Sequence, residues 1–400
     1  MKKVFCLICI FFCVDSTAED LKSIKFDYSA TMVGGVWSSN RRLDGNNYAV
    51  SNFLKLKSLT NLNKTFAVKF DGIIAHEYSE SNVYSPSLLR EVYLNIGLES
   101  ADIRFGKQLI PWGRADKINP TDFFSRRDYQ FLTSEDEEQK IGINALSVKK
   151  SIGDYELQAI VAHNEQVNRL PFYISNTTDV YKSDTQYGLK LDHYGSGNDW
   201  SVSYYNGIDR TPNLIPDRFF PNIIQQYNKI KAIGFDFAST HGDLTYRGEL
   251  AYSATDKNIL VSEYQRNNQV FFIIGFESSP FKDSYLSLQY FGLGVKDFDL
   301  PTNELSKASL LLGNQLNAYQ DGITARFAQS WMNDSLMIEI RSVIALKDEG
   351  VFLFPKFTYR PNNSWAVNLG GEYYGGKDTK SYLGQFSKNS NIFLEGRFYW

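Results

Sequence analysis

The sequence predicts an all-β fold, a transmembrane antiparallel up-and-down β-barrel of about 18 strands, with about 16 as the alternative count. Three observations lead to this prediction: strand-like alternation along most of the chain, a regular change between short and long connections, and an amphipathic final strand. Aromatic residues make up 15% of the 400 residues, yet the mean hydropathy is −0.33. A barrel in lipid has an apolar outside and a polar inside, which gives this combination.

The first 18 residues predict a cleavable signal peptide. Lys2 and Lys3 precede the apolar run Val4–Val14, and the small residues 16–18 follow it. This is the order of a secretory leader, and the run is too short to cross a bilayer as a helix. All three cysteines lie inside the leader, so residues 19–400 contain no thiol for a disulfide or a metal site. We expect residues 19–400 to form a single barrel domain.

Alternation with a period of two residues is clear in the segment Trp365–Tyr373. Trp365, Leu369 and Tyr373 share one side, whereas Asn368 and Glu372 lie on the other. Successive side chains of a strand point to opposite sides of the sheet. At about 3.3 Å per residue and a tilt near ~40°, the two terminal rings lie roughly 20 Å apart along the membrane normal. This spacing is typical of two aromatic girdles that flank a lipid-facing band.

Connection lengths alternate along the chain, which favours short periplasmic turns and long outer loops. Short connections follow the even-numbered strands, at 152–154, 195–199, 240–243 and 360–364. Most odd-numbered strands are followed by long ones, at 110–139, 164–183, 208–229, 254–267, 295–319 and 376–389. The link 347–350 is a short exception. The loops 110–139, 208–229 and 295–319 are predicted to be the main outer loops.

The final segment Asn391–Trp400 predicts an amphipathic strand that ends on an aromatic residue. Ile392, Leu394 and Phe398 share its apolar side with Trp400. Such an ending resembles the recognition signal for the machinery that inserts outer-membrane barrels, so we expect this machinery as a partner, with outer-membrane lipid and lipopolysaccharide. The 42 Lys and Arg against 45 Asp and Glu give no indication of a nucleic-acid partner.

Three motifs carry a resemblance to a known family. They are Gly106-Lys107-Gln108 followed by Trp112-Gly113 and Asn119-Pro120-Thr121-Asp122, then the segment 204–212, and the ending 375–399. In these motifs the sequence resembles a poorly characterised family of outer-membrane porin-like β-barrels related to alginate-export-type barrels. The resemblance covers most of residues 19–400 and implies a barrel in the outer membrane that transports an unspecified solute. The acidic segment 134–138 departs from the family, which has a more apolar stretch there.

The loop 110–139 is predicted to fold into the lumen and narrow it, because loops of this length in a compact fold are usually functional or disordered. Asp122 is expected to cap a helical turn that begins at Phe123. The acidic run Glu135–Glu138 is interpreted as a solvated outer surface, with cation binding as the alternative. The alternative for the whole loop is simple attachment to the wall. Candidate constriction residues are Trp112, Arg114, Asp116, Asn119, Asp122, Arg126, Arg127 and Asp128.

Charged residues on the polar side of the predicted strands are expected to face the lumen. They comprise six bases and six acids, so no strong charge selectivity is predicted, and pairing between neighbouring strands is favoured over a role in ion preference. Inward-facing rings at positions 285, 291, 352, 354 and 399 could form a sliding surface or fill space under loops. The expected lumen charges are Glu91, Arg104, Lys190, Asp192, Arg247, Glu249, Glu339, Arg341, Lys356, Glu372, Glu395 and Arg397.

These features predict an outer-membrane channel for passive or facilitated diffusion of a small solute. A non-conducting barrel that serves as a surface receptor or adhesin is the alternative, and a hydrolase in the barrel wall is a weaker one. The four histidines do not lie in a hydrolase motif or at metal-ligand spacing, so we expect neither enzymatic activity nor a cofactor.

Overall fold

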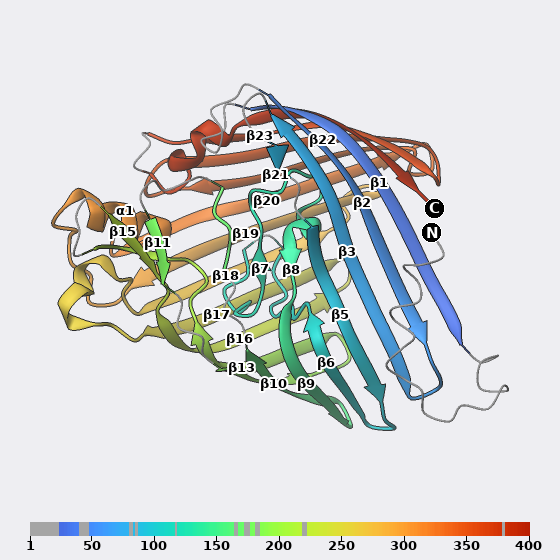
Figure 1. Ribbon diagram of the computed structural model, residues 1–400, viewed down its shortest axis with the longest axis horizontal. Coiled ribbons are helices and arrows are strands. Elements are labelled where there is room, and N and C mark those ends of the chain that lie inside the picture. The colour runs from blue at the N-terminus through green and yellow to red at the C-terminus, as the bar shows by residue number, and fades with distance from the viewer. Residues whose placement is uncertain are drawn as a thin grey trace.

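The computed structural model describes residues 24–39, 48–79, 83–84, 87–116, 118–163, 167–171, 177–180, 185–217, 222–377 and 381–400. The predicted leader 1–18 lies outside the described residues. The chain forms 18 long antiparallel strands in one closed sheet, and Figure 1 shows their arrangement as a barrel. The predicted fold and strand number are therefore confirmed.

Each strand pairs with the strands before and after it, and β1 pairs with β24 to close the ring, for example at Thr31 opposite Tyr399. The two-residue strand β4 (Val83–Tyr84) extends the edge of β3. In chain order the long strands are β1 (Lys25–Ser39), β2 (Tyr48–Asn61), β3 (Phe66–Ser79), β5 (Ser87–Gly97), β6 (Ala101–Gln108), β9 (Ile143–Ile152), β10 (Tyr155–His163), β12 (Thr185–His193), β13 (Asn198–Ile208), β16 (Lys229–His241), β17 (Leu244–Thr255), β18 (Gln269–Ser278), β19 (Ser284–Val295), β20 (Tyr319–Trp331), β21 (Leu336–Ala345), β22 (Gly350–Asn362), β23 (Trp365–Gly375) and β24 (Asn391–Tyr399).

The two ends of the barrel differ in the length of their connections. Tight turns such as 153–154 and 242–243 join strands at the short-turn end, whereas connections such as 109–142, 209–228 and 296–318 emerge at the long-loop end. Small elements occupy the long connections. These are β7 (Arg126–Arg127), η3 (Asp136–Gln139), β8 (Lys140–Ile141), β11 (Thr177–Val180), β14 (Asn213–Pro216), β15 (Ile223–Gln226), η4 (Ile259–Tyr264), α1 (Glu304–Leu312) and η5 (Gly384–Asn389). None of the described helices is long and apolar enough to cross a membrane.

The outer surface of the barrel is apolar and its inner surface is polar, the reverse of a soluble protein. On β23, Trp365, Leu369 and Tyr373 are about half exposed, at 49%, 50% and 56%. The intervening Asn368 is buried on the inner side, where its amide donates to Glu395 at 3.0 Å. An exposed apolar band on the outside of a closed ring of strands is the arrangement that lipid requires, because a closed sheet has no free edge of unpaired backbone groups.

A charge placed in the middle of this band should destabilise the barrel. Leu369→Arg is expected to lower the free energy of unfolding by about 2–4 kcal/mol in lipid vesicles, because Leu369 lies midway between two outer aromatic rings. Leu98→Arg is the matched control: Leu98 is 53% exposed but lies in a short turn. Denaturant titration of both variants measures the difference. Equal losses at the two positions would contradict the placement of the band.

Candidate functional site

The connection 109–142, between β6 and β9, folds into the lumen. Figure 1 places its short strands β7 and β8 inside the ring. Its side chains reach well-separated parts of the inner wall: Arg114 lies 2.6 Å from Asp236 on β16, and Glu138 lies 2.9 Å from Arg397 on β24. The loop therefore crosses the lumen and does not simply follow one side of it.

Glu249 on β17 is the main anchor for the first part of the loop. One of its carboxylate oxygens accepts the backbone N–H groups of Arg114 and Ala115, both at 2.6 Å. The other accepts the N–H and the hydroxyl of Thr121, at 3.1 and 2.9 Å. Gly113 permits this approach, because it has a φ of +90° and a β-carbon there would lie 2.6 Å from the carboxylate. One wall carboxylate thus holds the loop backbone at two points.

The side chain of Arg114 makes a second attachment, to an acidic patch of the inner wall. Its guanidinium lies 2.6 Å from Asp236, 3.0 Å from Asp192 and 3.6 Å from Asp199. Lys190 also contacts Asp192, at 2.8 Å. Because a guanidinium presents several N–H groups in a fixed plane, it satisfies several carboxylates at once. The acidic patch is therefore occupied by the loop and by a lysine of the wall.

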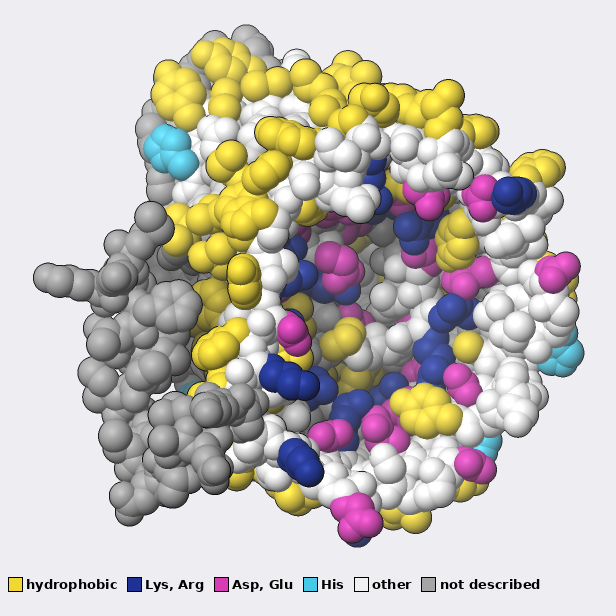
Figure 2. Space-filling model, turned by 90° about the vertical axis from the view of Figure 1, so that its right-hand side faces the viewer, with side chains coloured by type: hydrophobic (Ala, Val, Ile, Leu, Met, Phe, Trp, Pro, Cys, Tyr) yellow, Lys and Arg dark blue, Asp and Glu magenta, His cyan; other side chains and the backbone are white. Residues whose placement is uncertain are grey.

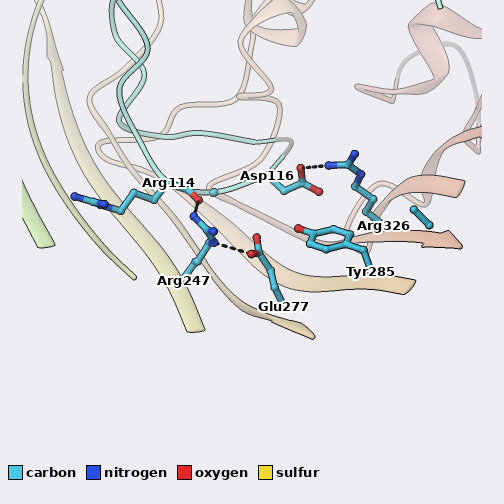
Figure 3. Close-up of a pocket in the computed structure, with 8 residues that line it drawn as sticks. Arg114, Asp116, Arg247, Glu277, Tyr285 and Arg326 are labelled. Carbon is cyan, nitrogen blue, oxygen red and sulfur yellow. Dashed lines mark hydrogen bonds and ion pairs between the residues drawn. The ribbon is translucent and has the colours of Figure 1, made fainter. Parts of the chain in front are cut away.

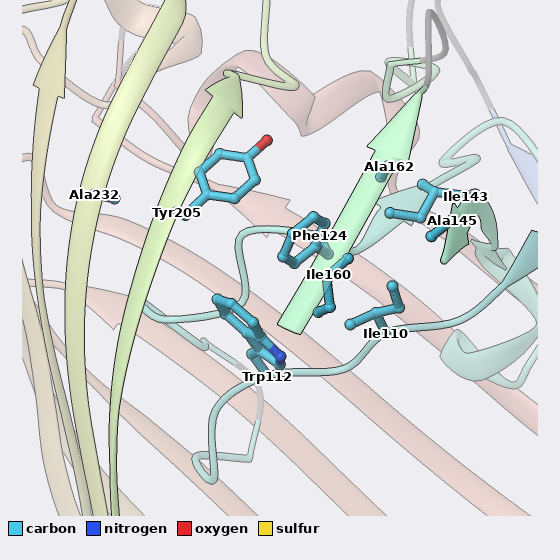
Figure 4. Close-up of a cluster of buried hydrophobic side chains, with 9 residues drawn as sticks. All are labelled: Ile110, Trp112, Phe124, Ile143, Ala145, Ile160, Ala162, Tyr205 and Ala232. Carbon is cyan, nitrogen blue, oxygen red and sulfur yellow. The ribbon is translucent and has the colours of Figure 1, made fainter. Parts of the chain in front are cut away.

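Trp112 attaches the loop through apolar packing to strands β9, β10, β13 and β16 of the wall. The indole is buried, lies edge-on to Phe124 with ring centroids 4.9 Å apart, and donates its N–H to Gln158 on β10 at 3.0 Å. Figure 4 shows the indole within a cluster contributed by the loop and by strands of the wall. The cluster comprises Ile110, Trp112, Phe124, Ile143, Ala145, Ile160, Ala162, Tyr205 and Ala232.

The turn at 118–122 closes the first part of the loop. The carbonyl of Asn119 accepts the N–H of Asp122 at 3.2 Å, and the carboxylate of Asp122 accepts the N–H of Trp112 at 3.3 Å. Burial raises the pKa of Asp122, while hydrogen bonds partly offset that rise. The predicted helical turn at Phe123 is wrong, since the backbone there is not helical. The carboxylate of Asp122 binds back to Trp112 and does not cap a helix.

Arg126, Arg127 and Asp128 lie between two long connections, with Arg126 and Asp128 buried and Arg127 partly buried. Arg126 donates to the carbonyl of Val167 at 2.6 Å, and Asp128, fully buried, pairs with Arg169 at 3.0 Å. The carbonyl of Arg127 accepts the N–H of Arg169 at 3.0 Å. These three residues therefore contribute to packing between the loops. The sequence analysis had predicted that they form part of the constriction.

The acidic run 135–138 binds the basic part of the inner wall. Its interpretation as a solvated outer surface is wrong, because three of its four carboxylates reach bases on β2, β21, β22 and β24. These bases line the side of the lumen opposite the acidic patch that holds Arg114. The ion pairs are Glu135–Lys356 (3.0 Å), Asp136–Arg341 (2.6 Å), Glu138–Lys55 (3.0 Å) and Glu138–Arg397 (2.9 Å).

Glu138 is the most enclosed member of the run. Burial alone would raise the pKa of its carboxyl group, but the charges of Arg397 and Lys55, with hydrogen bonds from Arg397 and Thr133, lower it to about 2. The carboxylate is therefore ionised at neutral pH although its side chain is almost fully buried. A buried charge of this kind is stable only while its partners remain in place.

The other expected lumen charges find partners in the wall, in the loop or in both. Pairing within the wall, as expected, occurs at Arg247–Glu277 (2.9 Å) and Glu339–Lys356 (3.2 Å). Several charges of the wall bind the loop instead, which the sequence analysis did not predict. The remaining contacts are Glu91 with the N–H of Leu109 (3.0 Å), Arg104 with Asn95 (3.2 Å), Glu372 with Asn391 (2.9 Å) and Glu395 with the N–H of Ser134 (3.1 Å).

Arg90 is a lumen residue that strict alternation misses. The register between β3 and β5 shifts at Asp71, so that the extra residue Arg90 turns inward beside Glu91. Its guanidinium lies 2.9 Å from Asp71 and donates to the carbonyl of Glu137 at 2.5 Å and to that of Lys140 at 2.9 Å. Two adjacent charges within one strand were the signal that could have indicated the bulge.

The aromatic side chains expected to form a sliding surface are mostly packed. Phe352, Phe354 and Phe291 are 6%, 2% and 5% exposed, and the first two belong to a cluster that also contains Leu132 of the loop. Tyr285 is different, because it lines the open cavity described next. The second half of the loop therefore fills its side of the lumen with both apolar and charged contacts.

A cavity of about 440 Å³ remains between the loop and strands β17–β20. Figure 2 shows that the barrel is hollowed at its short-turn end, with charged side chains inside and hydrophobic ones outside. A much smaller space of about 10 Å³ shares Asp116 and Arg326 with it, so that this ion pair lies between the two. The larger cavity is lined by Arg114, Ala115, Asp116, Arg247, Glu277, Tyr285, Arg326 and Ala328.

Charges around the cavity are arranged in pairs. Arg247 pairs with Glu277 at 2.9 Å, and Arg326 pairs with Asp116 at 3.0 Å, with its guanidinium 5.2 Å from the centre of the Tyr285 ring. In Figure 3 the side chain of Arg114 points away from these pairs. The lining offers donors and acceptors to a polar solute without a strong net charge. Within the described ranges, no group of three or more potential His, Cys, Asp or Glu ligands could hold a metal ion.

No protein-family model matches the chain, and no curated protein matches it. Solved structures do match its fold. OccK8 (OprE) of Pseudomonas aeruginosa has a TM-score of 0.60 at 10% identity, covering 94% of this chain and 98% of that one. The outer membrane protein OpdK of the same organism has a TM-score of 0.57 at 11% identity, with 94% and 99% covered. OccAB4 of Acinetobacter baumannii has a TM-score of 0.54 at 9% identity, with 94% and 97% covered. The fold is that of an outer-membrane porin-like barrel.

Proposed function

We propose that this protein is an outer-membrane channel for passive or facilitated diffusion of small polar solutes, with the loop 109–142 as its constriction. The observation that carries the proposal is the loop's attachment to opposite walls, through Glu249 on one side and Arg397 on the other. These contacts hold the loop against both walls, and a polar cavity remains along β17–β20. A channel needs such a polar track, and a narrow section with groups that bind solutes weakly sets its preference.

Passage in this proposal involves no bond chemistry. A solute in the 440 Å³ cavity exchanges water for hydrogen bonds to the paired side chains of the lining, and then moves past the Asp116–Arg326 pair. Since each charge of the lining has a partner of opposite sign, neither cations nor anions are strongly favoured. The preferred class is therefore small, polar and without a large net charge.

Two further inferences belong to this proposal. The sequence motifs suggest a relation to alginate-export-type barrels, a narrower group than the porin-like fold. The closure of the barrel by β24, whose last backbone contacts join Trp400 to Ala30 at 2.9 and 3.1 Å, suggests that the barrel-insertion machinery recognises this strand.

Planar-bilayer conductance tests the proposal directly. We expect the refolded protein to conduct in discrete steps, and a variant that lacks residues 114–137 to conduct in larger ones. Gly113→Ala is the finer variant, because its β-carbon would meet Glu249 and displace the loop from the wall. Gly153→Ala is the matched control, since Gly153 also has a positive φ of 59° but has no atom within 4 Å of a β-carbon.

The outcomes separate the alternatives. Larger or noisier steps in Gly113→Ala, with unchanged steps in Gly153→Ala, support a constriction formed by the loop. If none of the folded proteins conducts, the channel function fails and the receptor or adhesin alternative takes its place. Far-UV circular dichroism and heat-dependent gel mobility check that each variant forms a barrel.

Breaking the charge pairs of the cavity should shift ion preference in opposite directions. Glu277→Gln leaves Arg247 without its partner and should favour anions, whereas Arg326→Gln should favour cations near Asp116. One charge at 4 Å in water is worth about 1 kcal/mol, so the permeability ratio should change by a factor of roughly five or less. The reversal potential in a salt gradient measures it, and it should lie near zero for the unmodified protein. Shifts of the same sign would contradict the assigned lining.

The ion pairs of Glu138 with Lys55 and Arg397 should make the stability of the protein depend on pH. The pKa of Glu138 in the folded protein is about 2, below the ordinary value of 4.5. The ion pairs therefore stabilise the protein fully above pH 4.5, and this stabilisation is lost as the pH falls toward 2. Glu138→Gln should be less stable at pH 7 by about 3–5 kcal/mol, the cost of breaking a buried ion pair. The difference in unfolding free energy between the two proteins should shrink as the pH falls. A difference in unfolding free energy that is constant from pH 7 to pH 2.5 would contradict this prediction.

A further inference from the structure

Four long connections meet at the long-loop end of the barrel, where Figure 1 shows α1, β11 and β15 gathered. They follow β10, β13, β19 and β23, and each contributes to one apolar cluster, whose members include Leu170, Leu214, Leu312 and Phe386. In addition, the side-chain amide of Asn389 donates to the carbonyl of Pro171 at 2.9 Å. We call this cluster and this hydrogen bond the roof.

The strands that carry these connections are spread around the ring. Between the connection after β10 and the connection after β23 lie ten long strands in one direction and eight in the other. The hydrogen bond from Asn389 to Pro171 therefore joins nearly opposite sides of the ring. The connections after β13 and β19 leave the ring between these two points. The roof thus spans the opening of the barrel and does not follow its edge.

The inner side of β19 is covered between the cavity and the roof. Tyr285, near the short-turn end of this strand, lines the cavity. The residues that follow on the same side toward the long-loop end include Gln289, Phe291 and Leu293, and all three are buried. The barrel is therefore hollowed at its short-turn end, as Figure 2 shows, whereas this part of the wall is covered toward the long-loop end.

Hydrogen bonding in and beside the roof is incomplete. Nδ2 of Asn228, Nε of Arg266 and Oδ1 of Asn389 are buried and have no hydrogen-bond partner among the described residues. Arg266 lies next to the roof, because its backbone N–H donates to Asn213 of β14 at 3.1 Å. Buried polar atoms without partners destabilise the closed arrangement, since water would satisfy them once the connections separate. Apolar packing favours the closed roof, and these three atoms favour its opening.

We propose that the roof is a gate, and that solutes pass between the cavity and the long-loop side only while the roof is open. The structure then represents the closed state. This inference rests on the channel function proposed above and adds a second barrier to the constriction loop. The two barriers are in contact, because the side-chain amide of Gln130 in the loop donates to the carbonyl of Leu170 at 3.0 Å. Opening of the roof therefore separates it from the loop or displaces both.

A reversible crosslink across the roof tests the gate. Residues 19–400 contain no cysteine, so the variant Pro171→Cys/Asn389→Cys provides a single pair of thiols. A short bis-methanethiosulfonate linker joins the two thiols, and a reductant releases them. We expect the linked protein to lose its conductance steps in a planar bilayer and to regain them on reduction. Each single-cysteine variant, treated with the same reagents, should keep its steps. Mass spectrometry verifies that the linker is in place.

Leu312→Ala tests the opposite direction. Truncation of this buried side chain removes packing from the roof, while alanine preserves the helix α1. The ratio of open to closed time should rise by about tenfold or more, because such truncations commonly change an equilibrium by at least this factor. Lys307→Ala is the matched control, since Lys307 is exposed on the same helix. Its ratio of open to closed time should be unchanged.

The outcomes distinguish the gate from the channel itself. Equal currents before and after linking, or an unchanged ratio of open to closed time in Leu312→Ala, would overturn the gate and leave the channel function intact. Absence of current in every variant, with all barrels folded, would overturn both. The variant that lacks residues 114–137 separates the two barriers: linking the roof in that background should still suppress its larger steps. Persistent current in the linked deletion variant would also overturn the gate.

Discussion

Glu138 binds Lys55 of β2 and Arg397 of β24, the two strands that flank β1 where the barrel closes. In a nearly dry environment, each of these three charges would cost several kcal/mol without its partners. The same carboxylate fixes the second half of the loop, since Thr133 also donates to it at 2.5 Å. One carboxylate thus bridges the strands on either side of β1, holds the loop in position and neutralises the buried bases. In the same part of the loop, Leu132 and Phe131 pack into two apolar clusters with residues of the wall.

The lumen consists of two differently charged sides that the loop bridges. Acids of β12, β16 and β17 face Arg114 and the backbone N–H groups near it, whereas bases of β2, β21, β22 and β24 face the acidic run 135–138. The loop therefore carries charge opposite to the wall at each end. The open cavity lies between these two sides, along strands where Arg247 and Glu277 neutralise one another within the wall. A passage at this position avoids both strongly charged surfaces.

Much of the fold could be predicted because alternation and turn length are local properties of the sequence. The 18 strand positions follow from the polar and apolar sides of segments such as Trp365–Tyr373, and a closed barrel is the usual way to pair every edge. The partners of the loop could not be predicted in this way. Glu138 and Arg397 are 259 residues apart, and an acidic run has the same local pattern whether it is solvated or faces a basic wall. Arg90 was not predicted to face the lumen, because a bulge adds one residue to the strand there. Alternation alone does not indicate where such a bulge occurs.

The large sequence separation of the loop from its last anchor has a consequence for how the protein assembles. Ser134 and Glu138 bind Glu395 and Arg397 on the final strand, so the loop cannot reach its final position until the rest of the chain is in place. An incomplete sheet leaves the carboxylates of the loop hydrated and the bases of β2 and β21 unmatched. Contacts of such long range form slowly, because the chain loses much conformational freedom before they are gained. The final strand therefore has to join the sheet before the loop can take its position in the lumen.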